Sequence, residues 1–493
     1  MRRVLKWIGG LLALVAAAVV VLAAIVAVNT FRLGSKQLQV AAIPRAAVDE
    51  QGAAKRLAEA VRFKTISNFL NPDQDADALR GLREHIAASF PAFHAVAKRE
   101  IVGGHSLLYT WQGSDSAAKP IALLAHQDVV PVAPGTEKDW QQPPFDGVIA
   151  DGFIWGRGSW DDKGNLYSML EAAEQMAKAG FRPKRTIYFA FGHDEEVSGQ
   201  RGAKAIAALL ASRGVKLDFV LDEGLLITDG IMKGLDKPAA LIGVAEKGYA
   251  TLVLTSRATP GHSSMPPRET AIGMMAAALA RLEDHSLPAR VRGAVGEMFD
   301  TLAPEMHGFN RVVLSNLWLF KPLLVRELDK SGPTRAMVRT TTALTIFNAG
   351  DKDNVLPGNA EATVNFRLLP GDTQDSVTAH VRDTVKNDKI AIAPFPGNTN
   401  PPPVTGTAST GYRTLNQTIR EIFPDVVVSP GLMIAATDSR HYAGLTDNIF
   451  RFSPVRATSE DLKRFHGTNE RLSIANYADM IRFYLRFIQS SAG

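Results

Sequence analysis

The fold is decided by the stretch Arg185-Thr-Ile-Tyr-Phe-Ala-Phe-Gly-His-Asp-Glu-Glu-Val-Ser-Gly199, which joins an apolar run to a cluster of acids. Residues 186–191 are rich in apolar, aromatic and β-branched side chains and are predicted to form a buried strand. Three carboxylates follow, Asp194, Glu195 and Glu196. Charges this close together beside a core strand are costly unless protons or metal ions neutralise them. Acids in a row also occur in solvated turns, so the neighbouring strands decide between the two explanations.

A second apolar run, residues 120–126, ends on His126 and is followed two positions later by Asp128. Residues two apart on an extended chain face the same side. His126 can therefore bind a metal ion while Asp128 orients the histidine from behind.

Two further segments bring acids to the ends of predicted elements. Asp161 lies in the glycine-rich segment 156–164, and a helix capped by Asn165 is expected to follow over residues 166–179. The apolar strand 217–222 ends on Asp222 and Glu223. Because strands and helices alternate between residues 119 and 224, we expect these strand ends to meet at one edge of an open α/β sheet, where such folds bind ligands.

A second unit interrupts the first. Its predicted order is β-α-β-β-α-β, which matches a ferredoxin-like α+β sandwich. The elements are expected at residues 246–255, 267–283, 339–347, 360–368, 373–385 and 389–393. We assign no chemistry to the insertion 285–335. The expected domains are a tip and anchor (1–36), a first catalytic part (37–246), the inserted unit (247–396) and a second catalytic part (397–493).

An uncharged apolar run, Ile8 to Val28, begins the chain. About 20 helical residues span a hydrocarbon core of about 30 Å, so this run predicts one transmembrane helix. The charges before it outweigh those after it, which keeps the N-terminus in the cytoplasm and places the rest outside, in a periplasmic or extracellular space. The small residues near Ala23 and Ala24 leave a cleaved signal peptide and a secreted enzyme as the alternative.

Composition excludes several classes of protein. The chain has 493 residues, too many for one core, with 46% hydrophobic and 21% charged residues. A net charge of +5 without a dense lysine and arginine run does not indicate a nucleic-acid partner. The chain has no cysteine, so histidine and carboxylates are the strong metal ligands that remain.

Together these segments resemble the co-catalytic di-zinc peptidases, the family of carboxypeptidase S, aminoacylase and glutamate carboxypeptidase. The matching segments are residues 125–131, 156–164, 192–199, 221–224, 259–264, 354–357, 366–371 and 465–467. The resemblance is nearest to the carboxypeptidase S branch, which includes membrane-anchored members and secreted enzymes acting on N-fatty-acyl amino acids. It implies a mixed-sheet catalytic domain with an inserted lid domain that also serves dimerisation.

The resemblance also implies roles for individual residues. It implies two Zn²⁺ ions per chain, held by the terminal ligands His126, Glu196 and His466, the bridging Asp161, and a fifth ligand at Asp222 or Glu223, of which we favour Asp222.

Five other residues acquire roles by the same resemblance. Glu195 matches the general base, and Asp128 matches the carboxylate behind the metal ligand. His262 resembles a polarising histidine that completes the site, often across a dimer. Arg367 and Asn354 resemble groups that hold the substrate carboxylate.

These residues predict a hydrolase that cleaves an amide bond next to a free carboxylate. A histidine and carboxylate set without thiolates suits zinc, which lowers the pKa of bound water. A guanidinium is suited to gripping a carboxylate. We expect a carboxypeptidase acting on short peptides, with an N-fatty-acyl amino acid hydrolase/synthase as the first alternative and a non-catalytic, membrane-tethered zinc-binding protein as the second. No motif for a zincin, serine hydrolase, phosphate loop or dinucleotide site is present.

Overall fold

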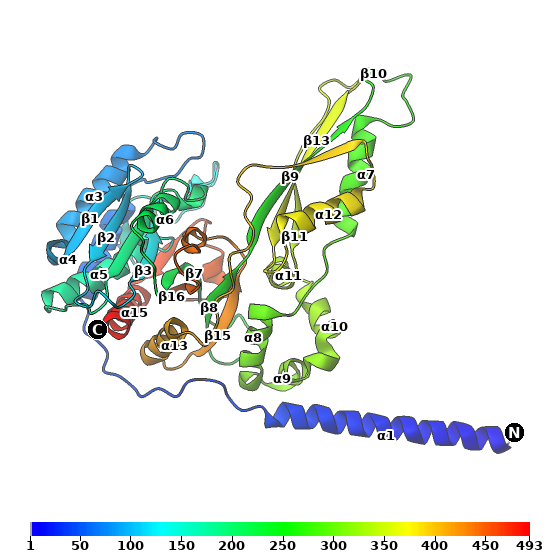
Figure 1. Ribbon diagram of the computed structural model, residues 1–493, viewed down its shortest axis with the longest axis horizontal. Helices are drawn as coiled ribbons and strands as arrows, with labels where there is room; N and C mark the ends of the chain where they lie inside the picture. The colour runs from blue at the N-terminus through cyan, green and yellow to red at the C-terminus, as the bar shows by residue number, and fades with distance from the viewer. Residues whose placement is uncertain (1) are drawn as a thin grey trace.

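The computed structural model describes residues 2–493, so Met1, the first residue of the predicted anchor segment, lies outside the described residues. A mixed eight-stranded sheet forms the larger body (Figure 1). Its strands in sheet order are β1 (Ala97–Val102), β2 (Ser106–Trp111), β6 (Ile187–Gly192), β3 (Ile121–His126), β7 (Val220–Thr228), β16 (Ile449–Ala457), β8 (Ala239–Glu246) and β15 (Val427–Met433). Because β6, β3, β7 and β16 run parallel to one another, their carboxyl ends lie at one edge of the sheet.

Helices cover both faces of this sheet, which explains why β3 is buried at every position. Leu123 and Ala125 of β3 pack into one core, whereas Ala122 and Leu124 pack into another on the opposite face. The first core includes α2 (Glu50–Val61), α5 (Lys163–Lys178), α13 (Thr410–Ile422) and α15 (Ile474–Ala492), and the second includes α6 (Ala203–Ser212).

Helix α5 begins three residues earlier than the sequence predicts. Asp162 occupies the position before the helix, and Asn165 lies inside it rather than at its cap. The Asn165 side chain instead accepts a hydrogen bond from the Tyr484 hydroxyl of α15. A buried tertiary contact therefore explains this asparagine, and the predicted cap is wrong.

The second unit has its own sheet and its own core. Its antiparallel strands are β11 (Thr341–Asn348), β13 (Asn359–Leu368), β9 (Gly248–Arg257) and β14 (Ile390–Pro394), and its helices are α7 (Ala271–Asp284) and α12 (Gln374–Val385). A small ribbon of β10 (Gly261–His262) and β12 (Val355–Leu356) lies at the outer end of this unit, away from the larger sheet (Figure 1). The order of the six main elements is the one predicted.

The insertion within this unit is helical and returns to the larger body. It contains α8 (Gly293–Leu302), α9 (Gly308–Ser315), α10 (Leu317–Leu328) and α11 (Gly332–Val338). Helix α8 packs against β15, and α9 contacts α1 (Arg2–Arg32), which projects from the body (Figure 1). Helix α1 is long and apolar enough to cross a membrane, since an 18-residue window of it has a mean hydropathy of 3.2.

The remaining elements are short or peripheral. They are α3 (Ala76–Ser89), α4 (Pro91–Val96), α14 (Ser459–Leu462), the three-stranded sheet of β4 (Val148–Ala150), β5 (Phe153–Trp155) and β17 (Arg471–Ser473), and the turns η1 (Glu137–Asp139), η2 (Glu195–Val197), η3 (Ala303–Glu305) and η4 (Asp438–Tyr442).

Candidate metal centre

The end of β3 presents His126 to the shared edge of the sheet. Its Nδ1 lies 3.0 Å from the carbonyl oxygen of Asp128, to which it donates, so Nε2 remains the atom available to a cation. The Asp128 carboxylate accepts hydrogen bonds from the backbone amides of Glu195 (3.2 Å) and Glu196 (3.1 Å). Asp128 therefore joins the end of β3 to the acidic turn η2 after β6.

Two groups of side chains converge beside His126, and they share one residue. His126, Asp161 and Glu223 form the first group, and Asp161, Glu196 and His466 form the second. The candidate ligand atoms within each group lie within 4.8 Å of one another. Asp161 Oδ1 is 3.1 Å from His126 Nε2, and Asp161 Oδ2 is 2.7 Å from His466 Nε2. Asp161 can therefore offer one oxygen to each of two adjacent cations.

The loop that carries Asp161 is held by Glu470, which is fully buried. Glu470 Oε1 accepts hydrogen bonds from the backbone amides of Gly158 (2.9 Å), Trp160 (3.0 Å) and Asp161 (3.2 Å). Its other oxygen lies 2.6 Å from Nη1 of Arg157, which is also buried. This network fixes the backbone that leads up to the shared carboxylate.

Glu223, and not the favoured Asp222, lies in the group of candidate ligands around His126. The Asp222 carboxylate accepts hydrogen bonds from the backbone amides of Glu223 (3.0 Å) and Ser439 (2.7 Å). Glu223 instead directs Oε1 toward His126 Nε2, at 3.7 Å. Neighbouring side chains of a strand point to opposite sides. The Asp222 side chain therefore points toward η4, whose Ser439 amide donates a hydrogen bond to it.

Burial makes this cluster electrostatically demanding. It raises the pKa of Glu195 and of Glu223 well above the usual range, and it raises the pKa of Glu196 as well. Asp161, followed by Glu196, raises the pKa of His466 to about 10. Glu196 Oε1 is buried and accepts no hydrogen bond from any residue between 2 and 493. Cations at the two groups would neutralise these carboxylates, so the residues present fit a metal centre.

Comparisons with known proteins agree with this geometry. Residues 122–490 match the peptidase family M20/M25/M40. The chain belongs to this family. It is 45% identical over 436 residues to N-fatty-acyl-amino acid synthase/hydrolase PM20D1 of Xenopus tropicalis, covering 88% of this chain and 84% of that protein. It is 42% identical over 473 residues to the probable carboxypeptidase S-like 2 of Dictyostelium discoideum, covering 94% and 91%.

The fold of this M20 peptidase also occurs in a solved structure. An M20 family metallo-carboxypeptidase, Sso-CP2 from Sulfolobus solfataricus, superposes with a TM-score of 0.65 at 18% sequence identity, covering 90% of this chain and 99% of that one. The predicted family and the predicted metallopeptidase class are therefore confirmed. Membership of a metal-dependent hydrolase family favours an enzyme over the non-catalytic alternative.

The second unit of the peptidase separates its predicted site residues. Arg367 lies near the inner end of β13, where its guanidinium stacks 4.8 Å above the Tyr249 ring. This guanidinium makes no hydrogen bond or ion pair with any residue between 2 and 493. His262 lies in the ribbon at the outer end, where its Nδ1 bonds to the Ser264 hydroxyl. Asn354 lies beside it, because its carbonyl accepts from the Ser263 amide at 3.1 Å.

The distance between Arg367 and His262 is too large for a single closing movement to bring both to one site. The nine residues of β13 from Asn359 to Arg367 alone extend over about 27 Å. Within one chain, a rigid second unit therefore cannot bring both side chains onto one substrate.

Sequence reasoning missed two residues of η4. Asp438 is buried, and neither of its carboxylate oxygens has a hydrogen-bond partner among residues 2–493. A Cβ at Gly199 would lie 2.0 Å from Asp438 Oδ1, so only glycine allows this approach. Burial raises the pKa of Glu195 and lowers that of Arg367; the positive charge of Arg440 opposes the first shift and adds to the second, so it lies close to both groups. The sequence held a signal for Asp438, because this acid follows the apolar strand β15, just as the other candidate acids follow apolar strands.

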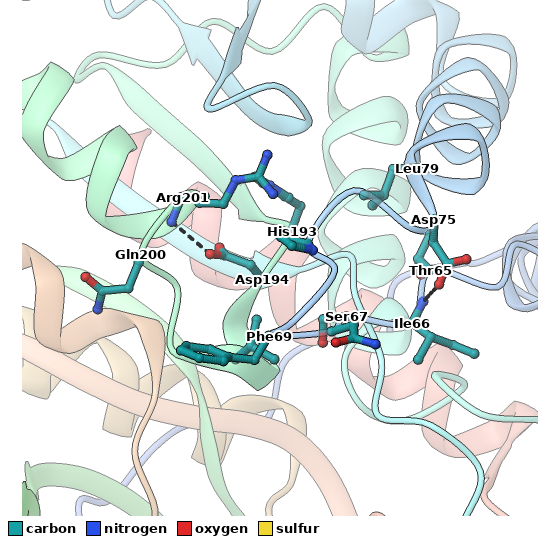
Figure 2. A pocket seen from close by; sticks show the side chains of 13 residues that line it. Thr65, Ile66, Ser67, Phe69, Asp75, Leu79, His193, Asp194, Gln200 and Arg201 are labelled. Carbon is teal, nitrogen blue, oxygen red and sulfur yellow. Dashed lines mark hydrogen bonds between the residues drawn. The ribbon is translucent and has the colours of Figure 1, made fainter. Parts of the chain in front are cut away.

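A cavity of about 120 Å³ lies beside the acidic turn (Figure 2). Its walls come from the loop after α2 and from the segment after β6, including Val197, the residue after Glu196. Figure 2 shows the apolar side chains of Ile66, Phe69 and Leu79 around it. The Phe69 side chain is 77% exposed, so an apolar wall leads from the surface toward the acidic turn.

Proposed function

We propose that this M20 peptidase is a di-zinc hydrolase that cleaves an amide bond adjacent to a free carboxylate. One observation carries the proposal: Asp161 offers an oxygen to each of two ligand groups, and the partly buried Glu195 directly precedes Glu196 of the second group. Two zinc ions held there would polarise the scissile carbonyl and supply a water that loses its proton near neutral pH.

Glu195 is the residue that we assign to proton transfer. Burial raises its pKa well above the usual value, which suits a carboxylate that must gain and then release a proton. Asp128 holds the Glu195 backbone amide at 3.2 Å, so the base is fixed relative to His126. Glu195 would accept the proton of the attacking water and deliver it to the leaving amine.

Arg367 supports recognition of a substrate carboxylate. Its guanidinium is partly buried without an anionic partner among residues 2–493, and its pKa is lowered, mainly by burial. Such a cation gains most from a bidentate anion. We assign the free carboxylate of the substrate to Arg367 and expect Arg367→Ala to weaken acidic substrates far more than their amidated analogues.

Two classes of substrate carry a free carboxylate next to an amide bond and differ in the group on the other side of that bond. Carboxypeptidase action on short peptides is the main proposal, and hydrolysis or synthesis of N-acyl amino acids is the second. The apolar cavity beside Val197 favours the second, because Phe69 and Ile66 could contact an acyl chain. Phe69→Ala should then lower kcat/KM about tenfold for long-chain N-acyl amino acids and leave dipeptides unaffected. Equal effects on both substrates would favour the peptidase.

The position of His262 supports a homodimer. This histidine is exposed at the outer end of the second unit, remote from the metal ligands of its own chain. We propose that it completes the site of a second copy. Co-expression of His262→Ala with Glu195→Gln should restore activity that neither variant has alone, since a mixed dimer contains one intact site. Failure to restore activity would place His262 outside the site.

The adjacent glutamates provide the test of the central assignment. Glu195→Gln should keep both metal ions while kcat falls by roughly 10²–10⁴, the usual contribution of a positioned acid-base group. Glu196→Gln removes an anionic ligand, so bound zinc should fall together with activity. Metal analysis of both purified variants decides the matter, and zinc loss only in Glu195→Gln would reverse the roles.

We further propose that α1 is an uncleaved anchor and that the catalytic domains lie outside the cytoplasm. The charges that precede Ile8 support this orientation, and secretion after cleavage is the alternative. A reporter fused after residue 493 should function only outside the cytoplasm. A reporter active only inside would contradict the orientation.

A further inference from the structure

Helices α9 and α10 expose apolar side chains beside the point where α1 meets the body (Figure 1). Phe309, Trp318 and Leu323 are 62%, 59% and 44% exposed. Helix α10 is mostly apolar, and none of its twelve residues is fully buried. We call Phe309, Trp318 and Leu323 the α9–α10 patch. Apolar surface concentrated in this way marks an interaction site.

The patch is fixed to the end of α1 by a buried polar network. Asn316, between α9 and α10, is fully buried; its Nδ2 donates to Thr30 Oγ1 (3.1 Å), and its Oδ1 accepts from Asn29 (3.0 Å). Arg311 of α9 donates to the carbonyl oxygens of Thr30 (3.2 Å) and Leu33 (3.1 Å). The patch therefore stays next to the body-proximal end of the apolar helix.

The chemistry of the patch matches the boundary between headgroups and acyl chains. Trp318 has an apolar ring with a polar N–H, the type of side chain enriched at membrane interfaces. Lys321 and Arg326 are exposed on the same helix, and neither has an ion-pair partner among residues 2–493. Such side chains keep their stems on apolar surface while their charges reach lipid phosphates.

We propose that the α9–α10 patch docks onto the bilayer that α1 crosses. This rests on the proposed anchor, because a spanning α1 places its body-proximal end at the membrane surface and the buried network holds the patch there. Because α1 and the patch belong to one chain, the bilayer that α1 crosses is the surface that lies against the patch. Attachment at both α1 and the patch would give the catalytic body a defined orientation on the membrane. Attachment at α1 alone would leave the body free to rotate about that point.

The absence of cysteine in the chain allows a direct test with single labels. Leu323→Cys carries a fluorophore in the patch, and Val19→Cys carries one in the middle of α1. Ile101→Cys of β1 is the matched control, because this apolar side chain is 49% exposed and lies on an edge strand of the large sheet. Each full-length variant is reconstituted into vesicles of phosphatidylcholine and phosphatidylglycerol that contain spin-labelled lipid.

The proposal predicts three different quenching patterns. The label at position 323 should be quenched more by a spin label near the headgroup than by one near the acyl terminus, since interfacial helices enter only about 5–10 Å. The label at position 19 should show the opposite preference, and the label at position 101 should not be quenched.

Other outcomes would overturn the proposal in distinguishable ways. Quenching at position 19 without quenching at position 323 would leave the anchor in place and remove the docking surface. Protection of position 323 from aqueous quenchers without lipid quenching would show that a second copy or another protein covers the patch. Loss of lipid quenching at both positions would refute the anchor and the docking surface together.

Discussion

The ion pair between Arg157 and Glu470 allows a quantitative prediction, because both residues are almost completely inaccessible to solvent. Glu470→Ala removes the acceptor of three backbone amides in the Asp161 loop and the partner of a buried guanidinium. The Arg157 charge would then remain in the core, where its other nitrogen still donates to the carbonyl oxygen of Gly467 at 2.9 Å.

The expected cost follows from this burial. Breaking a buried ion pair by removing one partner costs about 3–5 kcal/mol, because the remaining charge is uncompensated. The orphaned amides add to this loss, but the two effects share one loop and are not summed. For a body of several hundred residues, 1 kcal/mol corresponds to about 1–2 °C, so Tm should fall by roughly 3–10 °C. The loosened Asp161 loop should also release metal more readily to a chelator.

A surface pair supplies the matched control. Glu460 and Lys463 lie 2.7 Å apart, close to the 2.6 Å of the buried pair, but their side chains are 68% and 70% exposed. Glu460→Ala should therefore cost no more than about 1 kcal/mol. Thermal unfolding of the full chain in micelles, with zinc content measured during EDTA titration, compares the two variants. Equal Tm shifts would refute the inference that Glu470 stabilises the metal loop.

Three further predictions concern pH and metal. Burial, followed by Arg440, lowers the pKa of His441 to about 4, so as pH falls the unfolded chain binds a proton before the folded chain does. The Tm should therefore decrease as pH falls from about 6.5 to 4. The decrease should be smaller in His441→Gln. Burial raises the pKa of Glu195 and Glu223, so the Tm of the chelated chain should fall as pH rises above about 4.3, the usual pKa of glutamate, and zinc should suppress this fall. Finally, Glu223→Gln should lose zinc, whereas Asp222→Asn should mainly lower Tm; metal analysis with the opposite result would restore Asp222 as the ligand.

Much of this protein could be predicted from its sequence because the decisive patterns are local. An apolar run that ends on an acid or histidine marks a core strand and its functional end, as at His126 and Glu196. The parallel arrangement of β3, β6 and β7 then brings these ends together. The long apolar segment of α1 was equally visible, since its length and hydropathy depend on no partner.

Only the tertiary structure shows which of two neighbouring acids faces His126, and how far apart two distant candidates lie. The choice between Asp222 and Glu223 depends on the Ser439 amide, which reaches β7 from a segment more than two hundred residues away. The separation of His262 from Arg367 depends on how β13 extends from the larger sheet. Long-range contacts of this kind carry no periodicity along the chain, so neither composition nor spacing could indicate them.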